Sequence, residues 1–101
     1  MPAERALLVT IQLDSRFSQS RVRWSLEDEA RELQELARSA GCEIMGERFA
    51  KRHSPIAGTF LGSGKLQEIA EQVNTQQAQV VIFSQELSPA QQRNIEELLR
   101  V

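Results

Sequence analysis

The stretch Ala6-Leu7-Leu8-Val9-Thr10-Ile11 is an apolar run with the length of a β-strand. Such a run, without polar alternation, is typical of a strand that is covered on both faces, as in a parallel sheet. A second run, Val-Val-Ile-Phe, occupies residues 80–83, and residues 42–49 have an apolar centre. The pattern therefore predicts three strands, over residues 5–13, 42–49 and 80–83.

A helical pattern fills the interval between the first two strands. Ser25 is a typical N-cap residue, with Asp28 three positions later, and apolar residues then recur at helical spacing up to Ala40. Gly41 follows, and glycine suits the left-handed position after a helix. We therefore predict a helix from Ser25 to Ala40.

Two more helices are predicted further along the chain. One starts near Ser63 or Gly64, where apolar residues begin to recur at helical spacing. The other starts at Ser88, with Pro89 at its first position and Gln91 at its third, which is a complete capping box. Each predicted strand is thus followed by a helix.

This alternation predicts an α/β fold with three layers, in which helices cover both faces of a small parallel sheet of three to four strands. In such a sheet, all loops that leave a strand emerge at the same edge, and ligands of open α/β sheets bind at that edge. The loops concerned are 14–24, 51–62 and 84–88.

The composition predicts one cytoplasmic domain. The chain has 101 residues, and its single cysteine excludes an internal disulfide. No apolar run approaches the roughly 20 residues of a membrane span, and no signal-peptide pattern follows Met1. The net charge of −2 argues against a generic nucleic-acid binder, so any nucleic-acid contact must come from a local cluster.

Two stretches of the chain carry basic residues and no acidic ones, and both fall at the predicted ligand edge. Lys and Arg side chains contact RNA phosphates, so we predict RNA contact there, with an ordinary solvated surface as the alternative. The candidates are Arg16, Arg21 and Arg23 in the first stretch and Arg48, Lys51, Arg52 and His53 in the second.

The turn Gly62-Ser63-Gly64-Lys65 resembles a phosphate loop, but its spacing differs from a Walker A loop. That motif requires glycine at position 59 and Ser or Thr at position 66, where this chain has Thr59 and Leu66. We therefore expect no GTP hydrolysis by these residues. Two interpretations stay open: the amides and Lys65 bind a nucleotide phosphate, or the glycines only permit a tight turn that Ser63 caps.

No catalytic residue is predicted, and no metal site, because His53 has no Cys or carboxylate at ligand spacing. Capping explains Ser88, Pro89 and Gln91 in the third helix. It does not explain Arg93 and Asn94, which we therefore predict to contact a neighbouring domain.

The chain resembles the N-terminal domain of the HflX family of ribosome-associated GTPases over nearly its whole length. The most specific match is residues 87–96, Leu-Ser-Pro-Ala-Gln-Gln-Arg-Asn-Ile-Glu. The other matching segments are residues 5–9, 25–27, 40–41 and 60–65.

This resemblance implies partners and cofactors beyond residues 1–101. Similar proteins continue with a further strand, a helical segment and a GTPase domain, so we expect a domain that ends before its last strand and lacks the G domain. GTP and magnesium are expected in that G domain, and none in this domain. The family is associated with the large ribosomal subunit. An unpaired sheet edge also predicts self-association of the chain.

The resulting hypothesis is an accessory domain of an HflX-like GTP-binding protein that contacts the large ribosomal subunit or its RNA and controls the GTPase domain. One alternative is a domain that binds or hydrolyses ATP, since the resemblance links some N-terminal domains to ATP and the turn at residues 62–65 could hold a phosphate. The other is a structural domain that packs on its own G domain.

Overall fold

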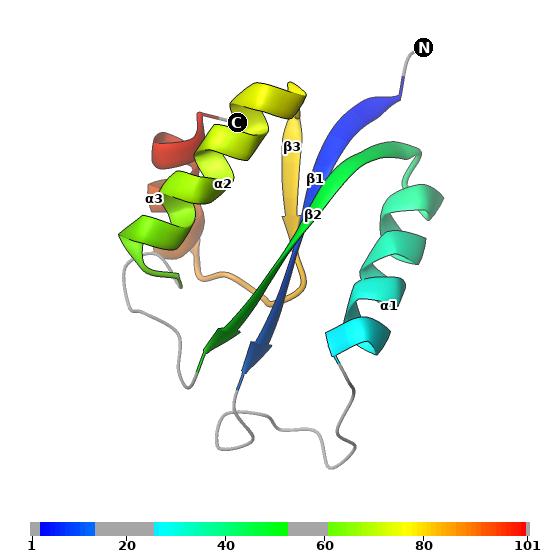
Figure 1. Cartoon of the computed structure of the whole chain (residues 1–101), viewed down its shortest axis with the longest axis horizontal. Coiled ribbons are helices and arrows are strands. Elements are labelled where there is room, and N and C mark those ends of the chain that lie inside the picture. Colours follow the sequence, from blue (N-terminus) through cyan, green and yellow to red (C-terminus); the bar gives the residue numbers. More distant parts are fainter. Residues whose placement is uncertain (1–2, 14–25, 53–60, 101) are drawn as a thin grey trace.

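The computed structural model describes residues 3–13, 26–52 and 61–100, in which strands and helices alternate (Figure 1). In chain order the elements are strand β1 (Glu4–Leu13), helix α1 (Leu26–Ser39), strand β2 (Cys42–Arg52), helix α2 (Ser63–Gln76), strand β3 (Val80–Phe83) and helix α3 (Pro89–Leu99). The predictions for residues 14–24 and for the cap at Ser25 lie outside the described residues.

The three described strands form one parallel sheet in the order β2-β1-β3. The central strand is β1, the strand with the continuous apolar run. Its residues from Ala6 to Ile11 are completely buried, as expected for a strand with a neighbour on each side and helices on both faces. Alternation along β1 divides the core into two layers.

Helices cover both faces of the sheet (Figure 1). On one face, Ala6 and Leu8 pack with Leu33 and Ala37 of α1. On the other face, Leu7, Val9 and Ile11 pack with α2 and α3; the buried residues that these two helices contribute are Leu66, Ile69, Val73, Ile95 and Leu99. The predicted three-layer α/β fold is therefore confirmed.

A β-bulge at Met45 changes which side chains of β2 face α2. Ala6 pairs with Ile44, but the next residue of β1, Leu7, pairs with Gly46, so Met45 is the extra residue. One inserted residue reverses the facing of every later side chain in a strand. Arg48 consequently pairs with Val9 and lies on the α2 face of the sheet.

The helix ends agree with the sequence in two cases and differ in a third. Gly41 has φ 82°, the left-handed conformation predicted after α1. Ser88 caps α3, because its hydroxyl accepts from the N–H of Gln91 while the Gln91 side chain accepts from the N–H of Ser88. The N-cap of α2, however, is Gly62, so the suggestion that Ser63 caps this helix is wrong.

The second strand extends further than its apolar pattern indicated. The sequence placed its end at Phe49, whereas β2 continues to Arg52 because its pairing with β1 runs on to the pair Leu13–Arg52. Among the described residues, no helix is long and apolar enough to cross a membrane.

Candidate functional site

The edge at which the sequence predicts binding is formed by the carboxyl ends of the strands. In Figure 1 the arrowheads of β1 and β2 lie at the same end of the molecule, where α1 begins. Ser84 continues the contact of β3 with β1: its backbone N–H donates to the carbonyl of Val9, and its hydroxyl accepts from the N–H of Ile11 at 2.7 Å. The chain is thereby fixed in place before α3 starts.

Some of the predicted site residues fall outside the part of the chain that the structure describes. Arg52 is described only by its backbone, as the last residue of β2, where it pairs with Leu13. The residues outside the described ranges are Arg16, Arg21, Arg23 and His53.

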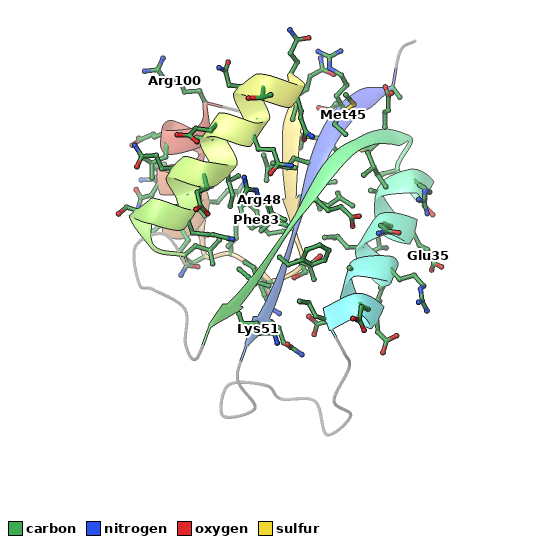
Figure 2. The ribbon with its side chains drawn as sticks, viewed as in Figure 1. Glu35, Met45, Arg48, Lys51, Phe83 and Arg100 are labelled. Atoms are coloured by element: carbon green, nitrogen blue, oxygen red, sulfur yellow. The ribbon has the colours of Figure 1, made fainter. Side chains whose placement is uncertain are left out.

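Arg48 and Lys65, which the sequence assigned to different candidate sites, come together at one carboxylate. Arg48 Nη1 and Lys65 Nζ each lie 3.7 Å from the same atom, Oε2 of Glu68. Lys65 and Glu68 are on α2, and Arg48 extends toward that helix from β2 (Figure 2). Two positive charges thus share one negative charge, so this cluster has a net positive charge.

Side chains of α2 hold the guanidinium of Arg48 in place. Arg48 Nε donates a hydrogen bond to Oε1 of Gln72, and Nε2 of Gln72 donates to Oε1 of Gln76 at 3.1 Å. Gly46 leaves room for these amides, because a Cβ atom there would lie 2.8 Å from Nε2 of Gln72. With Nε engaged, Nη1 of Arg48 is directed at Glu68.

Lys51 does not belong to this cluster. Lys51 follows Arg48 by three positions in β2 and pairs with Gln12 of β1. Because side chains alternate along a strand, it lies on the opposite face of the sheet, the face that α1 covers. Lys51 is exposed near the carboxyl end of β2 (Figure 2), and Phe49 on the same face is 46% exposed. The predicted basic stretch is thus divided between the two faces of the sheet.

The turn at residues 62–65 leads into the first turn of α2. Gly62 has φ −65° and ψ 158°, its carbonyl accepts the first helical hydrogen bond from Leu66 at 3.1 Å, and the first turn of α2 contains no acidic residue. Neither Gly62 nor Gly64 has a positive φ, and a Cβ atom on Gly64 would meet open space. The backbone of this turn therefore does not require glycine at either position.

Arg93 and Asn94, which the sequence assigns to contact with a neighbouring domain, are exposed on α3. Near them, the edge strand β3 and α3 enclose a groove of about 490 Å³. All four residues of β3 line this groove, together with Leu87, Ile95 and Leu99. Its apolar lining comes from residues that also pack against the core, on one face of the sheet or the other.

One carboxyl group in the described residues has a perturbed environment. Oε2 of Glu29, on α1, is buried without a hydrogen-bond partner among the described residues. Burial and, to a smaller extent, the negative charge of Glu32 raise the pKa of the Glu29 carboxyl above its ordinary value. The described residues contain no group of three or more His, Cys, Asp or Glu able to hold a metal ion.

Glu68 and Gln72, which hold the cluster together, are not among the residues predicted from the sequence. The spacing of Lys65 and Glu68, three apart on a predicted helix, is a readable signal for an ion pair. The contact with Arg48 has no such local signal, because it depends on the bulge at Met45 and on the packing of α2 against β2.

Residues 27–101 match the model of a protein family described as GTP-binding GTPase N-terminal. This match covers well over half of the chain and, among the described residues, runs from the first turn of α1 through α3. The chain therefore belongs to the family of GTP-binding GTPase N-terminal domains.

The relatives that the chain matches include several proteins named GTPase HflX. The chain is 41% identical over 95 residues to the GTPase HflX of Escherichia coli K12, covering 94% of this chain and 20% of that protein. It is 39% identical over 75 residues to the GTPase HflX of Caldanaerobacter subterraneus, covering 74% and 18%. With the GTPase HflX of Akkermansia muciniphila it shares 33% identity over 96 residues, covering 95% and 21%. The predicted resemblance to HflX is confirmed, and the chain spans about a fifth of the length of these relatives.

Proposed function

We propose that this domain contacts RNA of the large ribosomal subunit and controls the GTPase domain of an HflX-type protein. Its family and its relatives, each named GTPase HflX, support a role beside a GTPase domain. GTP and magnesium then bind in that GTPase domain, and not in residues 1–101. The observation that carries the RNA contact is the meeting of Arg48 and Lys65 beside the start of α2.

The chemistry of this cluster suits a phosphate group. Phosphate contacts in nucleic-acid complexes come from Arg and Lys side chains and from helix N-termini. Here Arg48 and Lys65 are only about one-third exposed, with side-chain exposures of 32% and 31%, so they are held in place and do not extend freely into solvent. The nearby first turn of α2 lacks acidic residues that would repel a phosphate.

RNA binding measured over a range of salt concentrations tests this proposal. Replacing both cations, as Arg48→Gln with Lys65→Gln, should weaken binding of a single-stranded RNA and reduce the log–log salt slope by up to about 1.4, since each lost phosphate contact removes about 0.7. The matched control is Arg38→Gln with Arg100→Gln, which removes the same charge from exposed positions outside the cluster. Equal binding by the two double variants would refute the RNA contact at this cluster.

The alternative function, ATP binding at residues 62–65, is favoured by one specific observation. Neither Gly62 nor Gly64 is required by the backbone, and the space beside Gly64 is open, which suits close approach of a phosphate. Under this alternative, calorimetry should detect ATP binding that Gly64→Val abolishes. The purely structural alternative assigns Arg93 and Asn94 to contact with the G domain.

A further inference from the structure

Glu68 occupies the position between the two cations to which the proposed function assigns an RNA phosphate. Its Oε2 atom is 3.7 Å from both Arg48 Nη1 and Lys65 Nζ. These distances exceed the 2.7–2.9 Å typical of charge-assisted hydrogen bonds, so both ion pairs are loose. The Glu68 side chain is also the most exposed of the three, at 56% compared with 32% for Arg48 and 31% for Lys65.

We propose that Glu68 is an internal competitor of RNA: its carboxylate neutralises Arg48 and Lys65 in the free domain, and an RNA phosphate displaces it on binding. This inference rests on the proposed RNA contact and adds its regulation. The competitor lowers the affinity of this cluster for a phosphate.

The geometry makes this exchange easy for the protein. Displaced Glu68 returns to water at little cost because it is already more than half exposed. Arg48 keeps its place when Glu68 leaves, because Gln72 holds its Nε atom independently of the carboxylate. The arriving phosphate replaces the carboxylate as the negative charge beside the two partly buried cations. It also offers more acceptor oxygens than a carboxylate.

The strength of the competition follows from the strength of the ion pairs. Ion pairs between partly exposed charges are weak. Removing a competitor that is held by such pairs should therefore change the RNA-binding equilibrium by only about two- to fivefold. Glu68→Gln should therefore bind RNA about two- to fivefold more tightly than the wild type. In a protein that already carries Arg48→Gln and Lys65→Gln, adding Glu68→Gln should give no gain in RNA affinity. Glu68 then has no cation to neutralise, so removing its charge changes nothing at this cluster.

Fluorescence anisotropy with a short single-stranded RNA at low salt can measure this effect. The matched control is Glu71→Gln, which removes the same charge from an exposed residue of the same helix that has no ion pair with Arg48 or Lys65 among the described residues. A second variant, Glu68→Asp, keeps the charge but shortens the reach, and should also bind more tightly than the wild type. Circular dichroism establishes that each variant is folded.

The outcomes separate this inference from the proposed function. Tighter binding by Glu68→Gln than by Glu71→Gln supports the competition. If the wild type binds RNA but Glu68→Gln equals Glu71→Gln, or binds less tightly than the wild type, Glu68 is not a competitor and only the RNA contact stands. If neither the wild type nor Glu68→Gln binds RNA, both proposals are wrong.

Discussion

Two glycines near helix ends differ in whether the backbone conformation requires glycine. Gly41 has φ 82°, a conformation that costs other residues about 1–2 kcal/mol, whereas Gly64 has no positive φ and faces open space. Gly41→Ala should therefore lower the free energy of unfolding by about 1–2 kcal/mol. Gly64→Ala should raise it by about 0.5 kcal/mol, because alanine is the better helix former.

Urea denaturation of the two variants beside the wild type checks this pair of effects. Each serves as the control for the other, since both replace a hydrogen by a methyl group. A loss of stability in Gly64→Ala would mean that the turn at residues 62–65 needs its glycine for folding. The open glycine would then no longer favour a ligand.

Glu29 is expected to make stability depend on pH. Burial raises its pKa in the folded state above that of the unfolded state, so the folded state binds the proton more readily. The stabilising effect of this proton is fully present below the unfolded pKa, near pH 4, and is lost as pH rises through the folded pKa. Glu29→Gln should therefore be more stable than the wild type at neutral pH, with the difference shrinking as the pH falls toward 4.

Thermal denaturation at several pH values measures this difference. Glu27→Gln is the control, because Glu27 is an exposed carboxylate in the same first turn of α1. A difference between wild type and Glu29→Gln that stays constant across this pH range would show that folding does not raise the pKa of Glu29.

The contact between Arg48 and Glu68 shows where prediction from sequence stops at the level of residues. Both residues are visibly charged, and Lys65 with Glu68 has the spacing of a helical ion pair. The face on which Arg48 lies, however, depends on the bulge at Met45. Without that extra residue, alternation from Ile44 would place Arg48 beneath α1. Gly46, an isolated glycine inside the strand, is a sign that a bulge lies nearby, but it does not show which residue is inserted.

At the level of elements, the best defined helix start is that of α3. The hydroxyl of Ser88 accepts from the N–H of Gln91 at 3.1 Å, and the Gln91 amide oxygen accepts from the N–H of Ser88 at 2.9 Å. Ser88→Ala should destabilise the protein by about 1 kcal/mol, which lowers Tm by roughly 4–8 °C. Because the two bonds are reciprocal, the loss of unfolding free energy in the double variant Ser88→Ala with Gln91→Ala should be smaller than the sum of the two separate losses.

A double-mutant cycle measured by thermal denaturation checks this expectation, with Ser39→Ala as the control at an exposed helix end. Strict additivity would show that the two hydrogen bonds form independently. The capping box was predictable because its three-residue spacing is local. The start of α2 was not, since Gly62 and Ser63 are both common N-cap residues and only the backbone conformation assigns the cap to Gly62.

For the whole molecule, the alternation of strands and helices was sufficient to predict the layers. The apolar run of β1 indicated a strand buried on both faces, and β1 is the central strand. The strand order β2-β1-β3 could not be predicted from this pattern. The spacing of apolar residues indicates which residues are buried, but it does not indicate which strands are neighbours. The carboxyl ends of β2 and β3 are consequently separated by β1, which divides the predicted ligand edge.

The two outer edges of this sheet differ, and the difference leads to a prediction about association. The edge strand β2 carries a bulge and the charged residues Arg48 and Lys51, features that discourage pairing with another chain. The edge strand β3 reads Val-Val-Ile-Phe, and among the described residues it pairs only with β1 and borders an apolar groove. We therefore expect self-association through β3 at high protein concentration.

Ile82→Lys tests that expectation, because lysine on an edge strand opposes pairing while its aliphatic stem still covers apolar surface. Sedimentation velocity over a range of concentrations should show that the wild type associates and that Ile82→Lys remains monomeric. Leu36→Lys is the control: Leu36 is 60% exposed on α1, so this variant adds the same charge at an apolar position away from β3. If Leu36→Lys prevented association as well, net charge would be the cause; if the wild type stayed monomeric throughout, the edge of β3 would not be a pairing surface.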